Sequence, residues 1–357
     1  MTKEEEKYLF WLTSLSGVGL SFVQRFFERY KSIDKAQSLS ETDIENAEWM
    51  KPRERNQFAK TYKQEGWRHE WEQLEKNHIS FYSYFHESYP DRLKHIDSPP
   101  KRLFVKGKLP DAAKLSVAVV GARNCTPYGR DMARMFSYRL AAAGVYVISG
   151  MALGIDGWGH QGALEAGGET YAVLGSGVMR CYPSCHQNLY ESIIRHGGVI
   201  SEFPVYARAK PVFFPMRNRI ISGLSDGILV VEAREKSGSL ITADAALEQG
   251  KDVFVIPGRI GDELSVGCNR LIRMGAVPVL TPDDILDYYG VKTPEGSQNV
   301  NEAEQKILTF LGGKTMHMDE ISMGLSMPAA QVLKSMIVLQ RKGYVIEVGR
   351  SFFMKKI

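Results

Sequence analysis

The feature that most constrains this chain is a short apolar run that recurs between residues 115 and 261, each time followed by a helical pattern. The first two runs cover residues 115–120 and 145–149, and a glycine follows each of them. Four more lie at 171–175, 198–202, 227–232 and 252–256. Such runs are typical of the strand–helix units of a parallel sheet. Six units predict an α/β fold: an extended Rossmann-like, doubly wound parallel sheet that binds its ligand at the carboxyl ends of its strands.

The composition narrows the class of protein. The 357 residues are 44% hydrophobic and 24% charged, which is typical of a soluble protein of two or three domains. The net charge is only +4, so a site for a polyanion must be a local patch. The four cysteines form neither a disulfide framework nor a zinc pattern, and we expect no metal or cofactor. Without a signal peptide or a spanning segment, a cytoplasmic protein with no membrane contact is expected.

The chain divides into four segments. Residues 1–78 are helical in pattern and predict a SAM-like or helix-hairpin-helix-like module. Residues 79–290 contain the α/β domain, which begins with an alternating strand pattern and ends in a helix. The polar stretch 291–300 has no period and predicts a linker. Residues 301–357 predict three helices and a hairpin, which is the winged-helix pattern.

Each terminal module has two interpretations. The turn at Gly17 and Gly19 either grips a DNA phosphate with its backbone amides or joins two helices of a bundle. The bundle is favoured, because only Arg25 and Arg29 flank the turn. In the C-terminal segment, the presumed recognition helix at 329–337 carries a single basic residue, Lys334. Readers of the major groove expose several Arg, Asn or Gln side chains, so a protein-contact or accessory role is favoured.

The first strand of the α/β domain ends in Gly121-Ala-Arg123. Backbone amides at the strand end, the dipole of a helix that begins near Tyr128, and the planar guanidinium of Arg123 together suit an anion. The alternative is that Arg123 pairs with a carboxylate of the protein. Neither a dinucleotide-binding glycine fingerprint nor a P-loop is present.

A second candidate segment interleaves basic and aromatic residues before and within a helix predicted at 218–224. Its members are Lys210, Phe213, Phe214, Arg217, Asn218 and Arg219. Cations suit the backbone of a single strand, and rings suit its bases. The alternative places the phenylalanines in the core and pairs the two arginines with acidic groups inside the fold. Ligand contact is favoured for Lys210 and for one of the two arginines.

Two further groups have both a structural and a functional interpretation. Lys236, Ser237 and Ser239 precede a helix predicted at 240–249, where hydroxyl groups serve as N-caps or bind phosphate. The N-cap is favoured for Ser239, and Lys236 strengthens the case for an anion. Asp156 and His160, four residues apart, suit an acid–base pair or a metal. A capping Asp and a structural His are favoured.

Taken together, the motifs resemble the DNA-processing protein A family (DprA, also called Smf). The residues that carry the resemblance span about half of the chain, in order. They are Tyr89-Pro90, Pro99-Pro100, Gly121-Ala-Arg123, Ser149-Gly150 with Asp156 and His160, Tyr182-Pro183, Glu202, Phe214-Pro-Met-Arg217-Asn-Arg219, Glu232, Ser237-Gly-Ser239, Pro257-Gly258 and Gly267-Cys-Asn269.

The resemblance implies a domain that binds single-stranded DNA without catalysis, forms a homodimer and hands DNA to the recombinase RecA during natural transformation. It places Gly121, Arg123, Lys210, Arg217, Asn218 and Arg219 in the DNA pocket, with Ser237 and Ser239 near a phosphate. The segment 184–188 departs from the family pattern, because a basic residue usual after Tyr-Pro is absent. Weaker binding, or a contact through Arg180, is expected.

Two other functions compete with this one. The first is hydrolysis of a nucleotide by a related Rossmann-like fold, with Glu202 and Glu232 as candidate acids. The second is regulation of duplex DNA through the winged helix. The first lacks the Pro-Gly-Gly-x-Gly-Thr loop of such hydrolases, and the second lacks a basic recognition helix.

Overall fold

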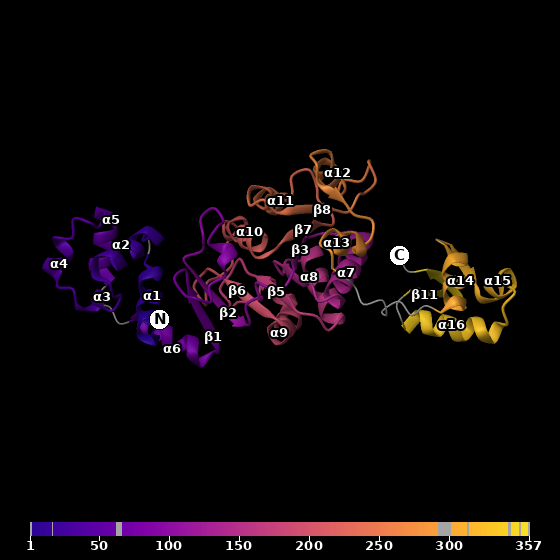
Figure 1. The fold of residues 1–357 in the computed structure, drawn as a ribbon, viewed down its shortest axis with the longest axis horizontal. Helices are drawn as coiled ribbons and strands as arrows, with labels where there is room; N and C mark the ends of the chain where they lie inside the picture. The colour runs from indigo at the N-terminus through magenta and orange to yellow at the C-terminus, as the bar shows by residue number, and fades with distance from the viewer. Residues whose placement is uncertain are drawn as a thin grey trace. The chain divides into compact units, whose positions relative to one another are not determined.

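The structure is a computed structural model that describes residues 2–15, 17–61, 66–291, 301–312, 314–341, 344–349 and 351–355. The chain forms two compact units, Met1–Val291 and Lys292–Ile357 (Figure 1). The linker predicted at 291–300 lies, apart from Val291, outside the described residues.

The first unit is built on a nine-stranded sheet with the order β1-β2-β6-β5-β4-β3-β7-β8-β9. The seven strands from β6 to β9 in this order are parallel, and β2 pairs antiparallel with both β1 and β6. The strands are β1 (Ile79–Ser83), β2 (Arg102–Gly107), β3 (Ser116–Val120), β4 (Tyr146–Ser149), β5 (Thr170–Val173), β6 (Gly198–Ser201), β7 (Gly227–Val230), β8 (Asp252–Val255) and β9 (Val277–Pro278). The predicted α/β class with a largely parallel central sheet is confirmed. The strand order reverses at β3, which places ligand sites at the carboxyl ends of β3 and its neighbours.

Helices cover both faces of this sheet, because successive strand side chains point to opposite faces. Val117 and Val119 of β3 pack in one cluster with α7 (Pro127–Ala142), α8 (Ile155–Glu165) and α13 (Pro282–Tyr288). Ala118 and Val120 pack in the other with α10 (Phe213–Leu224), α11 (Gly238–Glu248) and α12 (Val266–Arg273). The remaining helix of the domain, α9 (Gln187–His196), packs through Ile193 against the β6 side of the sheet.

The described residues of the N-terminal segment form six helices. They are α1 (Lys3–Ser14), α2 (Leu20–Tyr30), α3 (Lys35–Ser38), α4 (Glu41–Glu45), α5 (Pro52–Thr61) and α6 (Gly66–Lys76). Their core is continuous with the sheet domain, since Phe10 contacts Phe81 and Phe104 at ring-centroid distances of 5.5 and 6.1 Å. The Nζ of Lys101 donates to the carbonyl of Val18, inside the glycine turn. A residue of the sheet domain therefore binds the turn at Gly17 and Gly19, which was a candidate phosphate-binding turn.

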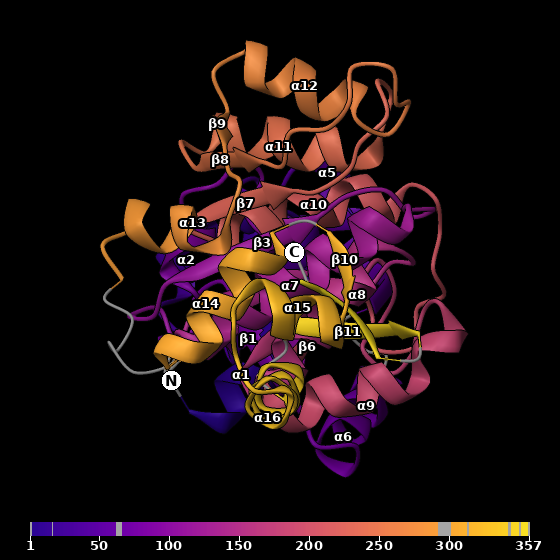
Figure 2. The ribbon, with the colours of Figure 1, turned by 90° about the vertical axis from the view of Figure 1, so that its right-hand side faces the viewer.

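In its described residues the second unit contains three helices and a three-stranded antiparallel sheet (Figure 2). Its elements are α14 (Glu302–Leu311), β10 (Thr315–His317), α15 (Met318–Gly324), α16 (Ala329–Arg341), β11 (Val345–Gly349) and β12 (Phe352–Lys355). The predicted hairpin is β11–β12, and the third strand, β10, was not predicted from the sequence. Among the described residues no single helix is long and apolar enough to cross a membrane; α15 and α16 pass that test only together, bent by 117°.

Candidate nucleic-acid interface

The helix α10 carries most of the predicted site residues, and it begins five residues earlier than the sequence predicted. The prediction placed the helix start at Asn218, whereas the helix spans Phe213–Leu224. Pro215 lies in the first turn, where a backbone N–H has no partner within the helix, so proline is tolerated there. As a consequence Phe213, Phe214 and Arg217 are helical residues with fixed directions and are not part of a loop.

Two glycines let α10 lie close to the sheet. The guanidinium of Arg217 donates to the carbonyl of Gly150 at 2.8 Å and also to the carbonyl of Val173, at the ends of β4 and β5. A Cβ atom at Gly150 would lie 2.4 Å from Nη1 of Arg217, and one at Gly175 would lie 2.6 Å from the ring of Phe214. Any larger residue at either position would push α10 away from the strand ends.

Arg217 is an internal cross-link in this structure. It is 4% exposed, and burial lowers its pKa to about 10, an effect that the charge of Asp156 opposes. The carboxylate of Asp156 accepts hydrogen bonds from the backbone N–H groups of Gly150 and Ala152, at 3.1 and 3.4 Å. These contacts agree with the alternative interpretation, in which this arginine binds groups inside the fold.

Asn218 and Arg219 are also engaged within the protein. The amide of Asn218 donates to the carbonyl of Gly238, at the start of α11, at 3.2 Å. Arg219 forms an ion pair with Glu202 at 2.5 Å, and both side chains are largely buried. Burial raises the pKa of Glu202 above its ordinary value, and the charge of Arg219 opposes that rise.

Arg123 and the remaining residues of the segment form a group of exposed cations and half-buried rings. The guanidinium carbon of Arg123 lies 5.0 Å from the ring centroid of Phe214, and Nζ of Lys210 lies 5.6 Å from that of Phe213. Both cations are exposed, and neither forms an ion pair with any residue that the structure describes. No carboxylate within the described chain forms an ion pair with Arg123, although the buried Asp156 is near enough for its charge to interact with that of Arg123.

Each phenylalanine packs on a second ring. Phe213 stacks on Phe203 with centroids 4.0 Å apart and an interplanar angle of 19°. Phe214 lies against Tyr182 at 5.5 Å and 38°. Tyr182 is 48% exposed, whereas the two phenylalanines are half-buried. We call Arg123, Phe214, Tyr182, Lys210 and Phe213 the cation–ring cluster.

Gly121 lies at the carboxyl end of β3, but the helix that follows is not free to receive an anion. The carboxylate of Glu232, just beyond the end of β7, accepts hydrogen bonds from the backbone N–H and the hydroxyl of Thr126, at 2.9 and 2.5 Å. Thr126 is the N-cap of α7. The carboxylate of Glu232 already neutralises the dipole of α7. The prediction that this dipole helps to bind a phosphate is therefore wrong.

At the start of α11 the N-cap is Ser237, not Ser239 as the sequence favoured. The hydroxyl of Ser237 accepts from the N–H of Ser239 at 3.4 Å, and the two hydroxyl groups are 2.8 Å apart. Ser239 is buried as the second residue of the helix, whereas Lys236 is exposed just before it. Lys236 therefore remains accessible to a ligand.

Asp156 and His160 do not form an acid–base pair. The hydroxyl of Thr170 donates to the carbonyl of Val147 at 2.7 Å, so it accepts from Nδ1–H of His160 at 2.6 Å. Burial lowers the pKa of His160 to about 3, which keeps the ring neutral. Within the described ranges no group of three or more His, Cys, Asp or Glu side chains is placed to hold a metal ion.

Sequence reasoning did not single out Tyr182 as a ring or Glu232 as a helix cap. In the sequence Tyr182 stands out only as part of the Tyr-Pro motif of the family resemblance. Glu232 had no such signal, because its partner Thr126 is remote in sequence and the two meet only when β3 and β7 pair.

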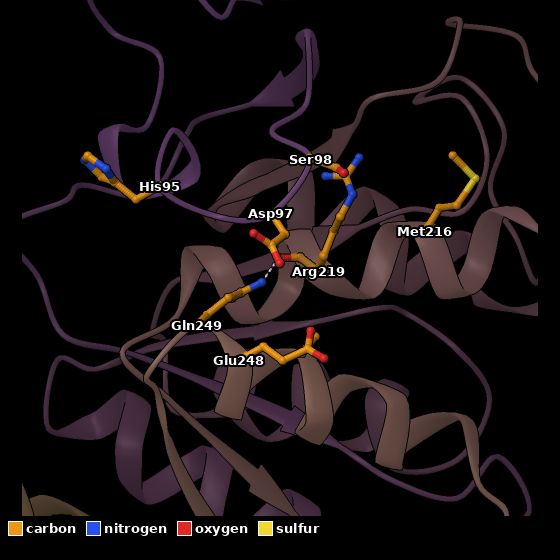
Figure 3. Close-up of a pocket in the computed structure, with 8 residues that line it drawn as sticks. His95, Asp97, Ser98, Met216, Arg219, Glu248 and Gln249 are labelled. Carbon is orange, nitrogen blue, oxygen red and sulfur yellow. Dashed lines mark hydrogen bonds between the residues drawn. The ribbon is translucent and has the colours of Figure 1, made fainter.

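A separate pocket of about 400 Å³ lies between α10, α11 and the loop that precedes β2 (Figure 3). It is lined by His95, Asp97, Ser98, Met216, Arg219, Ala245, Glu248 and Gln249. Arg219 is the one predicted site residue in this lining, and its charge is paired with Glu202. The carboxylates of Asp97 and Glu248 would repel a polyanion, so the cation–ring cluster is the better candidate for a nucleic acid.

Comparison with known proteins gives a family. The model of the family described as DNA recombination-mediator protein A matches residues 80–290. Protein Smf of Escherichia coli is 39% identical over 275 residues, which are 73% of this chain and 74% of that protein. DNA processing protein DprA of Bacillus subtilis is 40% identical over 202 residues, covering 56% of this chain and 68% of that protein.

Solved structures agree with this assignment. DNA processing protein A from Streptococcus pneumoniae superimposes with a TM-score of 0.67 at 32% identity, covering 80% of this chain and 98% of that one. The same protein from Helicobacter pylori, described for its single-stranded DNA binding mode, gives a TM-score of 0.53 at 27% identity, covering 59% and 95%. The chain therefore belongs to the DNA-processing protein A (DprA/Smf) family.

Proposed function

We propose that this protein binds single-stranded DNA through the cation–ring cluster. The observation that carries the proposal is that Arg123 and Lys210 are exposed, lie on aromatic rings and form no ion pair in the described part of the chain. Unpaired cations beside rings are what a single strand requires, with phosphates on the cations and bases against the rings. Lys236 extends the positive charge toward the start of α11.

The family relationship supports the same function. The Helicobacter pylori protein is described as binding single-stranded DNA, and this chain shares its fold over 59% of its length. We infer that the bound strand lies along the carboxyl ends of the strands, with Gly121, Ser237 and Ser239 beside it. Arg217, Asn218 and Arg219 support this surface from behind through their internal hydrogen bonds.

The proposal does not include catalysis. Glu202 and Glu232, the candidate acids of a nucleotide hydrolase, are held by Arg219 and Thr126. We propose the wider role that the family resemblance implies: a homodimer that protects incoming DNA and loads the recombinase RecA in natural transformation, in the cytoplasm. RecA and a second copy of this chain are thus the proposed protein partners.

The terminal parts receive accessory roles in this proposal. We infer that the second unit is of the winged-helix type, and in the described part of α16 the exposed basic side chain is Lys334. We infer that it contacts protein and does not read a DNA sequence. The N-terminal helices, which we propose to be of the SAM or helix-hairpin-helix type, stabilise the sheet domain through their shared core.

Fluorescence anisotropy with an oligothymidine and a matched duplex, repeated across salt concentrations, tests the function. We expect binding to the single strand that weakens as salt rises, because phosphate contacts release counterions. Equal binding to the duplex would favour the duplex regulator. No binding at low salt would overturn the proposal, and release of a base from nucleoside monophosphates would then be assayed.

A further inference from the structure

We infer that Tyr182 is a base-stacking residue of the proposed single-stranded DNA site. This inference rests on the proposed function and adds to it a residue that stacks on a nucleobase. The argument starts from the exposure of the rings in the cation–ring cluster. Tyr182 exposes 48% of its surface, while Phe213 and Phe214 are half-buried.

The two phenylalanines already have protein partners that limit their free surface. Phe213 is stacked on Phe203 at 4.0 Å, so that one of its faces is covered, and Lys210 lies 5.6 Å from its centroid. Phe214 lies against the backbone of Gly175 and has Arg123 over its ring at 5.0 Å. Of these three rings, Tyr182 presents the largest free surface to a base.

The position of Tyr182 relative to Arg123 fits one nucleotide unit. Both side chains contact the ring of Phe214, at 5.0 Å for the guanidinium and 5.5 Å for the tyrosine ring. A phosphate on Arg123 therefore places its neighbouring base beside Tyr182. Stacking tolerates any base, because every base has a π-face.

The segment that follows Tyr182 can supply little else to DNA. Residues 184–188 contain no lysine or arginine, and His186 is held by the carbonyl of Met151 at 3.1 Å. On the other side, Nε of Arg180 donates to the carbonyl of Tyr206 at 3.4 Å. Arg180 is nevertheless exposed, and none of the described hydrogen bonds uses its two terminal NH2 groups, so a phosphate can still bind there while Tyr182 offers its ring to a base.

The test compares Tyr182→Leu with Tyr182→Phe and with Tyr138→Leu, a matched control because Tyr138 on α7 is also 48% exposed. Stacking on one base is worth enough for Tyr182→Leu to weaken oligothymidine binding by about tenfold. Tyr182→Phe and Tyr138→Leu should bind as the wild type does. On an abasic oligonucleotide, wild type and Tyr182→Leu should bind equally, which a purely structural role of the ring would not produce.

Photo-crosslinking gives a second readout. An oligonucleotide that contains 5-iodouracil should crosslink to the peptide carrying Tyr182, and mass spectrometry identifies the site. This inference alone would be overturned if Tyr182→Leu bound oligothymidine as tightly as the wild type does. It would also be overturned if the substitution weakened binding to the abasic strand by the same factor as binding to oligothymidine. A wild-type protein that does not bind oligothymidine would overturn the proposed function and this inference with it.

Discussion

Two pairs of basic residues meet around α10, and their surroundings are opposite. Arg217 and Arg219 are buried or largely buried and are bonded to carbonyl groups or to Glu202. Arg123 and Lys210 are exposed and rest on rings without an ion pair in the described chain. The sequence places three of the four within ten residues of one another, yet the fold divides them into a structural pair and an available pair.

The difference teaches that a basic residue near a strand end is not by itself a phosphate contact. A buried guanidinium has lost its hydration and is stable only while its protein partners remain. An exposed cation on a ring stays hydrated until a phosphate replaces the water. The attraction between the cation and the ring holds the cation in a fixed direction. Burial and partners therefore separate the two roles, and the following predictions test that separation.

The largest effect is expected on the structural side. Arg217→Ala removes the donor for the carbonyl groups of Gly150 and Val173 and leaves Asp156 buried without the charge that opposes its desolvation. We expect a loss of about 3–5 kcal/mol in the free energy of unfolding, measured by urea denaturation. A loss below about 1 kcal/mol would mean that Arg217 is not a cross-link.

The available pair should show the reverse behaviour. Arg123→Ala and Lys210→Ala should each weaken oligothymidine binding by about 1.5–3 kcal/mol, the value of a hydrogen bond to a charged group. Their free energies of unfolding should change by less than about 0.5 kcal/mol.

Lys108→Ala is the matched control for these two variants. Lys108 is exposed just after β2, where Gly107 pairs with Gly198, the first residue of β6. Lys108 therefore lies at the amino-terminal end of the parallel strands, whereas the site lies at their carboxyl ends. We expect Lys108→Ala to leave oligothymidine binding unchanged. An equal loss of binding in Lys108→Ala would show that charge alone, without position, drives the binding.

The third prediction concerns pH. Burial lowers the pKa of His160 to about 3, below its ordinary value of 6.5, so the unfolded chain takes up a proton between these values and the folded chain does not. The contribution of the neutral His160 to the free energy of unfolding is therefore complete above pH 6.5 and is lost as the pH is lowered toward 3. Between pH 7 and 5 the loss from His160 should be about 2 kcal/mol. The variant His160→Gln should lack this part of the pH dependence; equal slopes in both proteins would refute the assignment.

The smallest effect is expected at α11. Ser237→Ala removes the N-cap hydroxyl, whose hydrogen bond to the N–H of Ser239 is long at 3.4 Å. We expect a loss of about 0.5–1 kcal/mol in the free energy of unfolding, monitored by thermal denaturation. Ser237→Thr, which keeps the hydroxyl, should restore stability; if it does not, Ser237 has a role other than capping.

Much of the sheet was predictable because its signal is local. Each buried strand is a short β-branched run bounded by a glycine or a polar residue, and the six predicted runs correspond to β3 to β8 within a few residues. The edge strand β9 has only two residues, too few to give a pattern. The order of the strands and the pairing of β2 with β6 depend on contacts between distant residues, so no local pattern reveals them.

The candidate site was predictable in composition but not in arrangement. The sequence predicted that Arg123 and Lys210 belong to it, and the structure places both on rings at the carboxyl ends of the strands. It did not reveal that Arg219 faces Glu202, since an ion pair across α10 and β6 depends on the tertiary fold. The start of α10 was misplaced because Pro211 and Pro215 suggest a loop, whereas both are compatible with a helix start.

The most direct test of the central claim is the salt dependence of binding in the wild type and in the double variant Arg123→Ala/Lys210→Ala. The logarithm of the oligothymidine affinity is plotted against the logarithm of the salt concentration for both proteins. If each residue binds one phosphate, the double variant should lose about 0.7 per contact, or about 1.4 in slope. Equal slopes in the two proteins would contradict the assignment of Arg123 and Lys210 as phosphate contacts.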